Sequence, residues 1–220
     1  MISPQNLTLR QGDTPAFNSS LKIGVLALQG AFLEHANMVR RLGATSVEVR
    51  LPRDLADLDG LIIPGGESTT IGKLASQFGL LDPLHQFIDN GRAVWGTCAG
   101  LIFLAKDIGA TGTGGHVVPP RLEVMDVTVN RNAFGRQVAS FEADLNLTFA
   151  DDGPFHALFI RAPKIEAVGD GVDVLATLDD GTIVAARQGN LLGTSFHPEL
   201  TDDLRFHHYF LTMAEQKPSS

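Results

Sequence analysis

The sequence has a single cysteine, Cys98, among its 220 residues. One cysteine allows no internal disulfide and no cysteine-rich metal cluster, which favours a reducing compartment, and we expect the cytoplasm. Basic residues are also scarce: 17 Lys and Arg stand against 25 Asp and Glu, a formal net charge of -8. Because binding to nucleic acid needs clustered basic side chains, this balance disfavours it.

Long hydrophobic runs are absent as well. No apolar stretch approaches the roughly 20 residues that a membrane-spanning helix needs, so no membrane association is expected. Residues 1–20 are polar and lack the apolar segment of a secretory signal, which predicts a flexible N-terminal extension. Residues 21–216 are long enough for one domain with a sizeable core, and residues 217–220 are expected to be a polar tail.

The first half of this domain alternates short aliphatic runs with segments of helical spacing. Strands are expected at residues 22–28, 47–51, 61–63 and 93–95, and helices at residues 32–42, 69–77, 83–90 and 99–105. This order predicts an α/β fold, a mostly parallel sheet with helices on both faces.

The second half is richer in strands. They are expected at residues 122–129, 137–141, 158–160, 174–178, 183–187 and 191–196, with a final helix at residues 202–213. The Gly-containing turns at residues 179–181 and 188–190 predict two hairpins.

The strand that contains Trp95 runs into Gly96-Thr97-Cys98-Ala99-Gly100 and then into a helix. This is a nucleophile-elbow pattern with cysteine in place of serine. We expect each glycine to be needed because neighbouring chains lie close to a sharp turn. The start of a helix favours a thiolate, and the Ala99 N–H is expected to face an oxyanion. The alternative is an inert, buried cysteine at a tight turn.

A candidate base follows in His197-Pro198-Glu199, between an apolar strand and the last helix. Pro198 favours an extended conformation at His197, and residues two apart in an extended chain point the same way. Glu199 is therefore expected to orient the His197 ring for proton transfer. The alternative is that Glu199 caps the last helix and His197 is a polar loop residue. The other histidines lack this context: His35 and His85 fit ordinary helices, His207 and His208 fit the final helix, and His116 and His156 fall in predicted loops.

Three motifs occur in a fixed order: Pro64-Gly65-Gly66 after a strand, the Cys98 elbow, and His197-Pro198-Glu199. Together they resemble class I glutamine amidotransferases. Four further segments narrow the resemblance to the glutaminase subunits of pyridoxal 5′-phosphate synthases: residues 28–35, 64–70, 129–137 and 159–163. The similarity covers about residues 21–213, and residues 1–20 and 109–123 depart from the pattern.

The resemblance implies a flavodoxin-like fold and hydrolysis of L-glutamine by Cys98, His197 and Glu199, without a metal or other cofactor. It implies a partner that consumes ammonia, the (β/α)₈-barrel synthase subunit. It also implies glutamine contacts from Gly66, Glu67, Ser68, Arg131, Ile160 and Arg161, and a partner interface that includes Gln29, Glu34 and His35.

Residue chemistry supports part of this assignment. The N–H groups of Gly65 and Gly66 can reach an oxyanion with no side chain in the way, and the guanidinium groups of Arg131 and Arg161 suit a carboxylate. The simpler alternatives are a helix cap by Ser68 or Thr69, and surface ion pairs for the arginines.

Segment 29–35 follows the first strand, so it is expected at the same sheet edge as Cys98. Two other functions remain open at this stage. One is a stand-alone cysteine hydrolase, such as a γ-glutamyl peptidase, and the other is a catalytically silent subunit.

Overall fold

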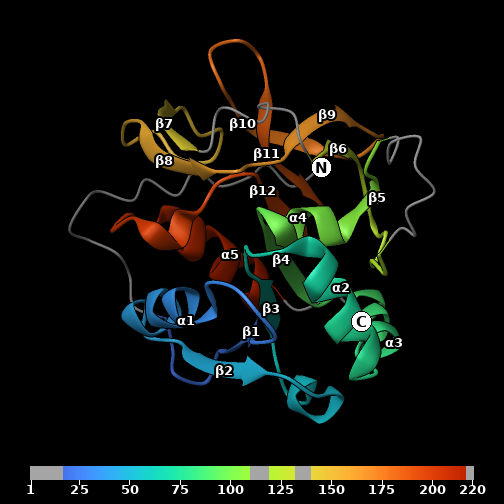
Figure 1. Ribbon diagram of the computed structural model, residues 1–220. Helices are drawn as coiled ribbons and strands as arrows, with labels where there is room; N and C mark the ends of the chain where they lie inside the picture. Colours follow the sequence, from blue (N-terminus) through green and yellow to red (C-terminus); the bar gives the residue numbers. More distant parts are fainter. Residues whose placement is uncertain (1–16, 110–118, 132–139, 217–220) are drawn as a thin grey trace.

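A computed structural model describes residues 17–109, 119–131 and 140–216 (Figure 1). The helices are α1 (Phe32–Arg41), α2 (Ser68–Gln77), α3 (Leu81–Asp89), α4 (Ala99–Leu104) and α5 (Arg205–Glu215), with short 3₁₀ turns η1 (Pro52–Leu55) and η2 (Pro198–Leu200). The strands are β1 (Lys22–Leu26), β2 (Thr45–Val49), β3 (Gly60–Ile63), β4 (Ala93–Thr97), β5 (Ala105–Asp107), β6 (Met125–Asn130), β7 (Ser140–Leu145), β8 (Phe155–Ile160), β9 (Lys164–Val168), β10 (Asp173–Thr177), β11 (Ile183–Gln188) and β12 (Leu191–Thr194).

The main sheet has a parallel half in the order β2-β1-β3-β4-β12. It continues through β11, β9 and β6 in antiparallel pairs and ends with β5 parallel to β6, while β10 pairs with β11. Gly96 lies opposite Ile63 and Gly193, so the carboxyl ends of β3, β4 and β12 meet at one edge. The predicted α/β architecture and both predicted hairpins are confirmed.

Helices cover both faces of the sheet (Figure 1). The side chains of α1 and α5 pack with the β7–β8 ribbon in one core, and those of α2, α3 and α4 form the other. Alternation along β4 sends Trp95 into the first core and Val94 into the second. The central strands are therefore buried on both sides, which explains their continuous aliphatic runs.

Two strands and one histidine differ from the sequence predictions. β9 carries few buried side chains, and β5 has only three residues directly after α4, so neither has a clear apolar signal. His156 lies in β8 rather than in a loop, with its ring exposed beside Asp144 and Glu142 of β7.

The folded part begins before Leu21. The Phe17 N–H donates to the Leu42 carbonyl, the Phe17 ring packs against His208, and the Thr45 hydroxyl donates to the Ser19 carbonyl. The prediction of a flexible extension is therefore wrong for residues 17–20, because Phe17 gains apolar contacts. The other predictions for the chain ends, an extension at residues 1–16 and a polar tail at residues 217–220, concern residues outside the described ones. His116 also lies outside them.

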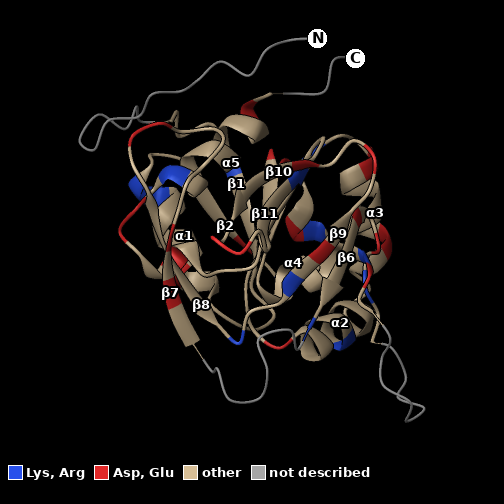
Figure 2. Cartoon of the chain, turned by 90° about the horizontal axis from the view of Figure 1, so that it is seen from above, with Lys and Arg blue, Asp and Glu red and all other residues tan. Residues whose placement is uncertain are grey.

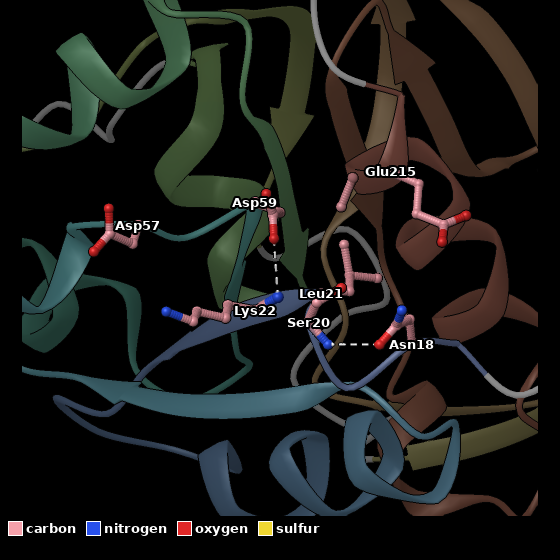
Figure 3. Close-up of a pocket in the computed structure, with 8 residues that line it drawn as sticks. Asn18, Ser20, Leu21, Lys22, Asp57, Asp59 and Glu215 are labelled. Carbon is pink, nitrogen blue, oxygen red and sulfur yellow. Dashed lines mark hydrogen bonds between the residues drawn. The ribbon is translucent and has the colours of Figure 1, made fainter.

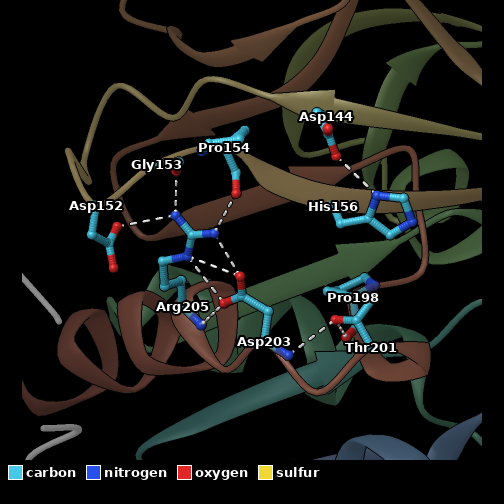
Figure 4. A network of polar contacts seen from close by, with 9 residues as sticks. All are labelled: Asp144, Asp152, Gly153, Pro154, His156, Pro198, Thr201, Asp203 and Arg205. Carbon is cyan, nitrogen blue, oxygen red and sulfur yellow. Dashed lines mark hydrogen bonds and ion pairs between the residues drawn. The ribbon is translucent and has the colours of Figure 1, made fainter. Parts of the chain in front are cut away.

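Arg205 ties the start of α5 to the loop before β8 (Figure 4). Its guanidinium bonds the carboxylates of Asp203 and Asp152 and the carbonyl oxygens of Gly153 and Pro154. Charge-assisted bonds of this kind are stronger than neutral ones. They hold the chain between η2 and α5 against the β7–β8 ribbon.

A surface cavity of about 350 Å³ lies at the amino ends of β1 and β3 (Figure 3). The Lys22 N–H donates to Asp59 there, and Glu215 approaches from α5. Cys98 follows the carboxyl end of β4, so this cavity belongs to the opposite edge of the sheet.

The distribution of charged side chains and the length of the apolar helices match what the sequence predicts. Among the described residues, Figure 2 shows Lys and Arg interspersed with Asp and Glu rather than gathered in one band. Within the same residues, no helix has both the length and the apolar character needed to cross a bilayer.

Candidate active site

Cys98 occupies a strained turn between β4 and α4. Its φ of 49° and ψ of -104° lie where non-glycine residues are rarely found, at a cost of about 1–3 kcal/mol. Its N–H donates to the Thr194 carbonyl of β12 at 2.8 Å, and its carbonyl accepts from Ile102 of α4. The neighbouring strand and helix thus hold the turn that places the thiol at the carboxyl edge of the sheet.

The two glycines of the elbow are required by close packing of backbone, as predicted. A Cβ on Gly96 would lie 2.5 Å from the Gly100 carbonyl, and a Cβ on Gly100 would lie 2.0 Å from the Ile63 carbonyl oxygen. Both distances are far below contact distance, and neither carbonyl can rotate away like a side chain. The turn therefore tolerates no side chain at either position.

His197 and Glu199 meet beside Cys98. The His197 Nδ1 lies 2.7 Å from Glu199 Oε1, and the Cys98 side chain also faces the ring. The route differs from the prediction, since residues 198–200 form the 3₁₀ turn η2 rather than an extended chain. The turn brings Glu199 back to the ring and leaves its carboxylate buried.

These contacts set the charge of the pair. Burial lowers the pKa of His197, but the Cys98 side chain and the Glu199 carboxylate outweigh it and raise the pKa to about 10. Burial likewise raises the pKa of Glu199, yet it lies below its usual range because His35 and His197 face the carboxylate. Since burial lowers the pKa of His35 itself to about 3, the positive charge opposite Glu199 belongs to His197.

The Gly65–Gly66 loop lies over the elbow. A Cβ on Gly65 would come within 2.5 Å of the His197 ring and 3.3 Å of the Cys98 Cβ. We expected the Gly65 N–H to face an oxyanion. It donates instead to Thr97 Oγ1 at 3.0 Å, so it is not available for that role. The Gly65 carbonyl accepts from Ala31, and in a trans peptide the Gly66 N–H points the opposite way.

Glu67 caps helix α2. Its carboxylate accepts from the N–H groups of Thr69 and Thr70 and from the Thr70 hydroxyl. The cap is thus Glu67 rather than the predicted Ser68 or Thr69, because the longer carboxylate reaches two amides at once. The Glu67 N–H donates to the Gln29 side chain at 2.7 Å, which ties the β1–α1 turn to this loop.

The candidate glutamine contacts lie around the same edge. Ile160, at the end of β8, is 41% exposed, and its carbonyl oxygen is 3.8 Å from the Cys98 sulfur. Arg161 follows it in a positive-φ conformation. Arg131 lies after β6 and donates to the Thr69 hydroxyl at 3.4 Å. The structure thus places the end of β8 beside Cys98 and Arg131 beside the start of α2. Residues 132–137 of the Arg131 motif lie outside the described residues.

One predicted interface residue is misplaced. His35 has no exposed surface and points into the protein, because it shares the apolar face of α1 with Val39 and Leu42; it cannot contact a partner. Glu34 is exposed and lines a cavity of about 280 Å³ between α1 and η2, together with Leu200.

Two residues of the site escaped the sequence analysis. Thr97 joins the Gly65 loop to His35 through its hydroxyl, and His207 bonds His35 from α5. For His35 and His207, the sequence did contain a pattern that predicts their burial. His207, Leu211 and Ala214 recur at helical spacing, as do His35, Val39 and Leu42, so the same periodicity that identified the helices also predicts these histidines on buried faces.

A mixed α/β sheet with a cysteine elbow after its central strand is the architecture that the resemblance to class I glutamine amidotransferases implies. The SNO glutamine amidotransferase family matches residues 25–216, and the chain belongs to this family.

Relatives extend the comparison over nearly the whole chain. The pyridoxal 5′-phosphate synthase subunit PdxT of Dehalococcoides mccartyi is 60% identical over 195 residues, which are 89% of this chain and 98% of that protein. The subunit of the same name from Herpetosiphon aurantiacus is 57% identical over 191 residues, 87% and 99% of the two chains.

Solved structures agree. A crystal structure of a glutamine amidotransferase superposes with a TM-score of 0.80 at 51% identity, covering 88% of this chain and 98% of the other. The structure of PurLQS from Thermotoga maritima, with a TM-score of 0.63 at 16% identity over 90% and 96% of the two chains, shares the fold alone.

Proposed function

We propose that this protein hydrolyses L-glutamine to glutamate and ammonia, and that it supplies the ammonia to a synthase subunit that makes pyridoxal 5′-phosphate in vitamin B6 synthesis. The observation that carries the proposal is the arrangement of Cys98, His197 and Glu199 in a chain of this family. The Cys98 side chain faces the imidazole, and the imidazole bonds a buried carboxylate at 2.7 Å. The names of the relatives support the partner, which we expect to be a (β/α)₈ barrel.

In the first half-reaction the Cys98 thiolate attacks the side-chain amide carbon of glutamine. The carbonyl oxygen becomes an oxyanion, which the N–H groups of Ala99 and Gly66 stabilise. As the C–N bond breaks, protonated His197 gives its proton to the leaving nitrogen, and ammonia departs. The product is a thioester between Cys98 and the glutamyl group.

In the second half-reaction the now neutral His197 takes a proton from water. The hydroxide attacks the thioester carbon, the C–S bond breaks, and glutamate leaves with the Cys98 sulfur restored as thiolate beside protonated His197. Glu199 stays ionised throughout and stabilises the imidazolium. The raised pKa of His197 suits this cycle, because the ring begins it protonated at neutral pH.

The substrate is held at its amino-acid end by groups around the elbow. Arg131 and Arg161 supply positive charge for the α-carboxylate, and the backbone at Ile160 lies beside the sulfur. Gly66, Glu67 and Ser68 form the wall that leads into α2. A reduced Cys98 is essential to the scheme, which fits the expected cytoplasmic location.

Ammonia release from glutamine, measured with and without the synthase subunit, tests the proposal. We expect release that rises when the partner is added and that falls below a few per cent in Cys98→Ala, with the far-UV circular dichroism of that variant unchanged. Appreciable hydrolysis by Cys98→Ala would exclude Cys98 as nucleophile. Partner-independent cleavage of γ-glutamyl peptides in preference to glutamine would instead support a stand-alone hydrolase.

A further inference from the structure

Two buried histidines lie behind the proposed catalytic residues. His35 of α1 and His207 of α5 have no exposed surface, and His35 Nδ1 lies 2.9 Å from His207 Nε2. On the other side of the His35 ring, Nε2 lies 3.2 Å from Thr97 Oγ1 and 3.3 Å from Glu199 Oε2. The mechanism above assigns neither histidine a role.

Both histidines are neutral. Burial lowers the pKa of His35 to about 3, although the Glu199 carboxylate opposes the shift, and burial also lowers the pKa of His207 to about 3. Each ring therefore carries one N–H and one bare nitrogen, and the surrounding groups decide which nitrogen bears the proton.

The contacts select one arrangement of protons. A bare Nε2 on His35 would put its lone pair against a carboxylate oxygen, whereas an Nε2–H is attracted to it. The proton of His35 then belongs on Nε2, and bare Nδ1 accepts from His207 Nε2–H. This leaves His207 Nδ1, which has no described hydrogen-bond partner, as a bare acceptor rather than a buried unpaired donor.

Glu199 gains a second donor from this arrangement. Its Oε1 holds His197, while Oε2 is buried and lies 3.3 Å from His35 Nε2. Among the described residues, no full hydrogen bond reaches Oε2. A buried carboxylate oxygen without a donor is costly, so the contact restrains the carboxylate against rotation. The same His35 N–H faces Thr97, whose hydroxyl oxygen accepts the Gly65 N–H.

We propose that His35 is a positioning residue for the reaction. It holds the Glu199 carboxylate and the Thr97 hydroxyl through Nε2–H, and His207 fixes its tautomer. One side chain of α1 thus links the base side of the site to the loop that carries the Gly66 N–H. The inference rests on the proposed function, and it predicts an effect on turnover rather than on substrate binding.

Two substitutions at His35 distinguish its hydrogen bonding toward Glu199 and Thr97 from its packing in the core. The amide nitrogen of Gln reaches about the position of an imidazole Nε2, so His35→Gln keeps a donor toward Glu199. The shorter His35→Asn places its amide near Nδ1 and loses that donor. His208 is the control: it follows His207 in α5, is also buried, and packs against Phe17 rather than the site.

Glutaminase kinetics and melting temperatures are to be measured for the four proteins in complex with the synthase subunit. His35→Asn is expected to lower kcat about tenfold or more with KM within about twofold, and His35→Gln to restore most of kcat. His208→Asn is expected to lower the melting temperature with kcat unchanged. Equal kcat in His35→Asn and the parent, or equal losses in both His35 variants at equal melting temperature, would overturn the positioning role.

The ¹⁵N shifts of the imidazole rings of the parent protein give a readout that needs no activity. At neutral pH His35 and His207 are expected as neutral Nε2–H tautomers, with His35 assigned by the loss of its signals in His35→Gln. An Nδ1–H tautomer at His35 would refute the arrangement. If the parent protein releases no ammonia but shows these tautomers, the proposed function is wrong while the hydrogen-bonded His35–His207 pair stands.

Discussion

Single residues at this site carry strain and charge that few other positions tolerate. Cys98 is held at positive φ by hydrogen bonds to β12 and α4, and His197 keeps its proton because a thiol and a carboxylate face it from two sides. The surrounding fold offsets the cost of the turn. What it gains is a sulfur fixed beside a charged imidazole.

The division of labour between His197 and Glu199 has kinetic consequences. In the proposed mechanism His197 moves a proton in both half-reactions, whereas Glu199 orients and charges the ring. His197→Asn is therefore expected to lower kcat by about a hundredfold or more. The factor by which Glu199→Gln lowers kcat is expected to be smaller by about tenfold or more. Ammonia release under saturating glutamine measures both, and equal or reversed losses would contradict these roles.

The pH profile tests the same pair independently. The proposed mechanism needs protonated His197, so we expect kcat/KM to be lost as pH rises through its raised pKa near 10. Glu199→Gln removes a negative charge that favours the imidazolium, and the alkaline limb should move to lower pH by about one unit or more. An alkaline limb that stays in place would show that Glu199 does not charge the ring.

The elbow glycine Gly100 should tolerate no side chain without loss of stability. In Gly100→Ala the new Cβ meets the Ile63 carbonyl oxygen at 2.0 Å, so β3 and α4 must separate. We expect a loss of about 1–3 kcal/mol in unfolding free energy by urea titration, together with a loss of kcat. Gly171→Ala is the control: Gly171 has positive φ but open space around it, so stability alone should fall.

At the scale of elements, α1 has two faces with different tasks. Its buried face presents His35 to Glu199, and its exposed first turn presents Glu34 beside η2. An ion pair between Arg41 and Asp202 joins the far end of α1 to the chain after η2. A partner that contacts α1 thus contacts an element that touches the proposed catalytic carboxylate.

Charge reversal on α1 tests the partner surface. Glu34→Lys is expected to weaken stimulation by the synthase subunit at sub-saturating partner, because ammonia is best passed on at the edge that bears Cys98. Asp82→Lys is the matched control, since Asp82 is also an exposed acid in the first helical turn but lies on α3, across the sheet. Stimulation that is identical in the two variants would remove Glu34 from the interface.

The whole molecule joins parts that are distant in the chain at one sheet edge. Thr97 and Cys98 end β4, Gly65 follows β3, and Glu199 arrives after β12. Two helices from opposite ends of the domain, α1 and α5, then enclose the His35–His207 pair on one face of the sheet. Folding of the entire domain is therefore required to bury these histidines without charge.

Stability in acid should report this burial. Below pH 6.5 the unfolded chain protonates His35 and His207, whereas the folded protein does so only near pH 3. The unfolded state thus binds more protons in this window, and the unfolding free energy falls as pH falls from 6.5 toward 3, by up to about 1.4 kcal/mol per pH unit for each histidine. Urea titrations at pH 7, 6 and 5 measure the slope, which should be smaller in His207→Gln; an unchanged slope would contradict neutral burial.

Local neighbours in the chain determined much of this protein. The Gly96-Thr97-Cys98-Ala99-Gly100 run specifies its own sharp turn, and the aliphatic runs at β1, β3 and β4 specify strands buried on both faces, so the α/β order and the candidate nucleophile followed from sequence. His197 and Glu199 are two residues apart, and their contact was expected even though a 3₁₀ turn, not an extended chain, makes it.

Contacts between distant segments were decided only by the tertiary structure. Helical spacing marks His35 as a member of an apolar face, but the partner of that face depends on how α1 packs against β4 and α5. The Gly65 N–H could have served an oxyanion, and it binds Thr97 because β3 and β4 lie side by side. Hydrogen bonds are short-ranged and directional, so the pairing of these groups depends on their distance in space, which sequence separation does not set.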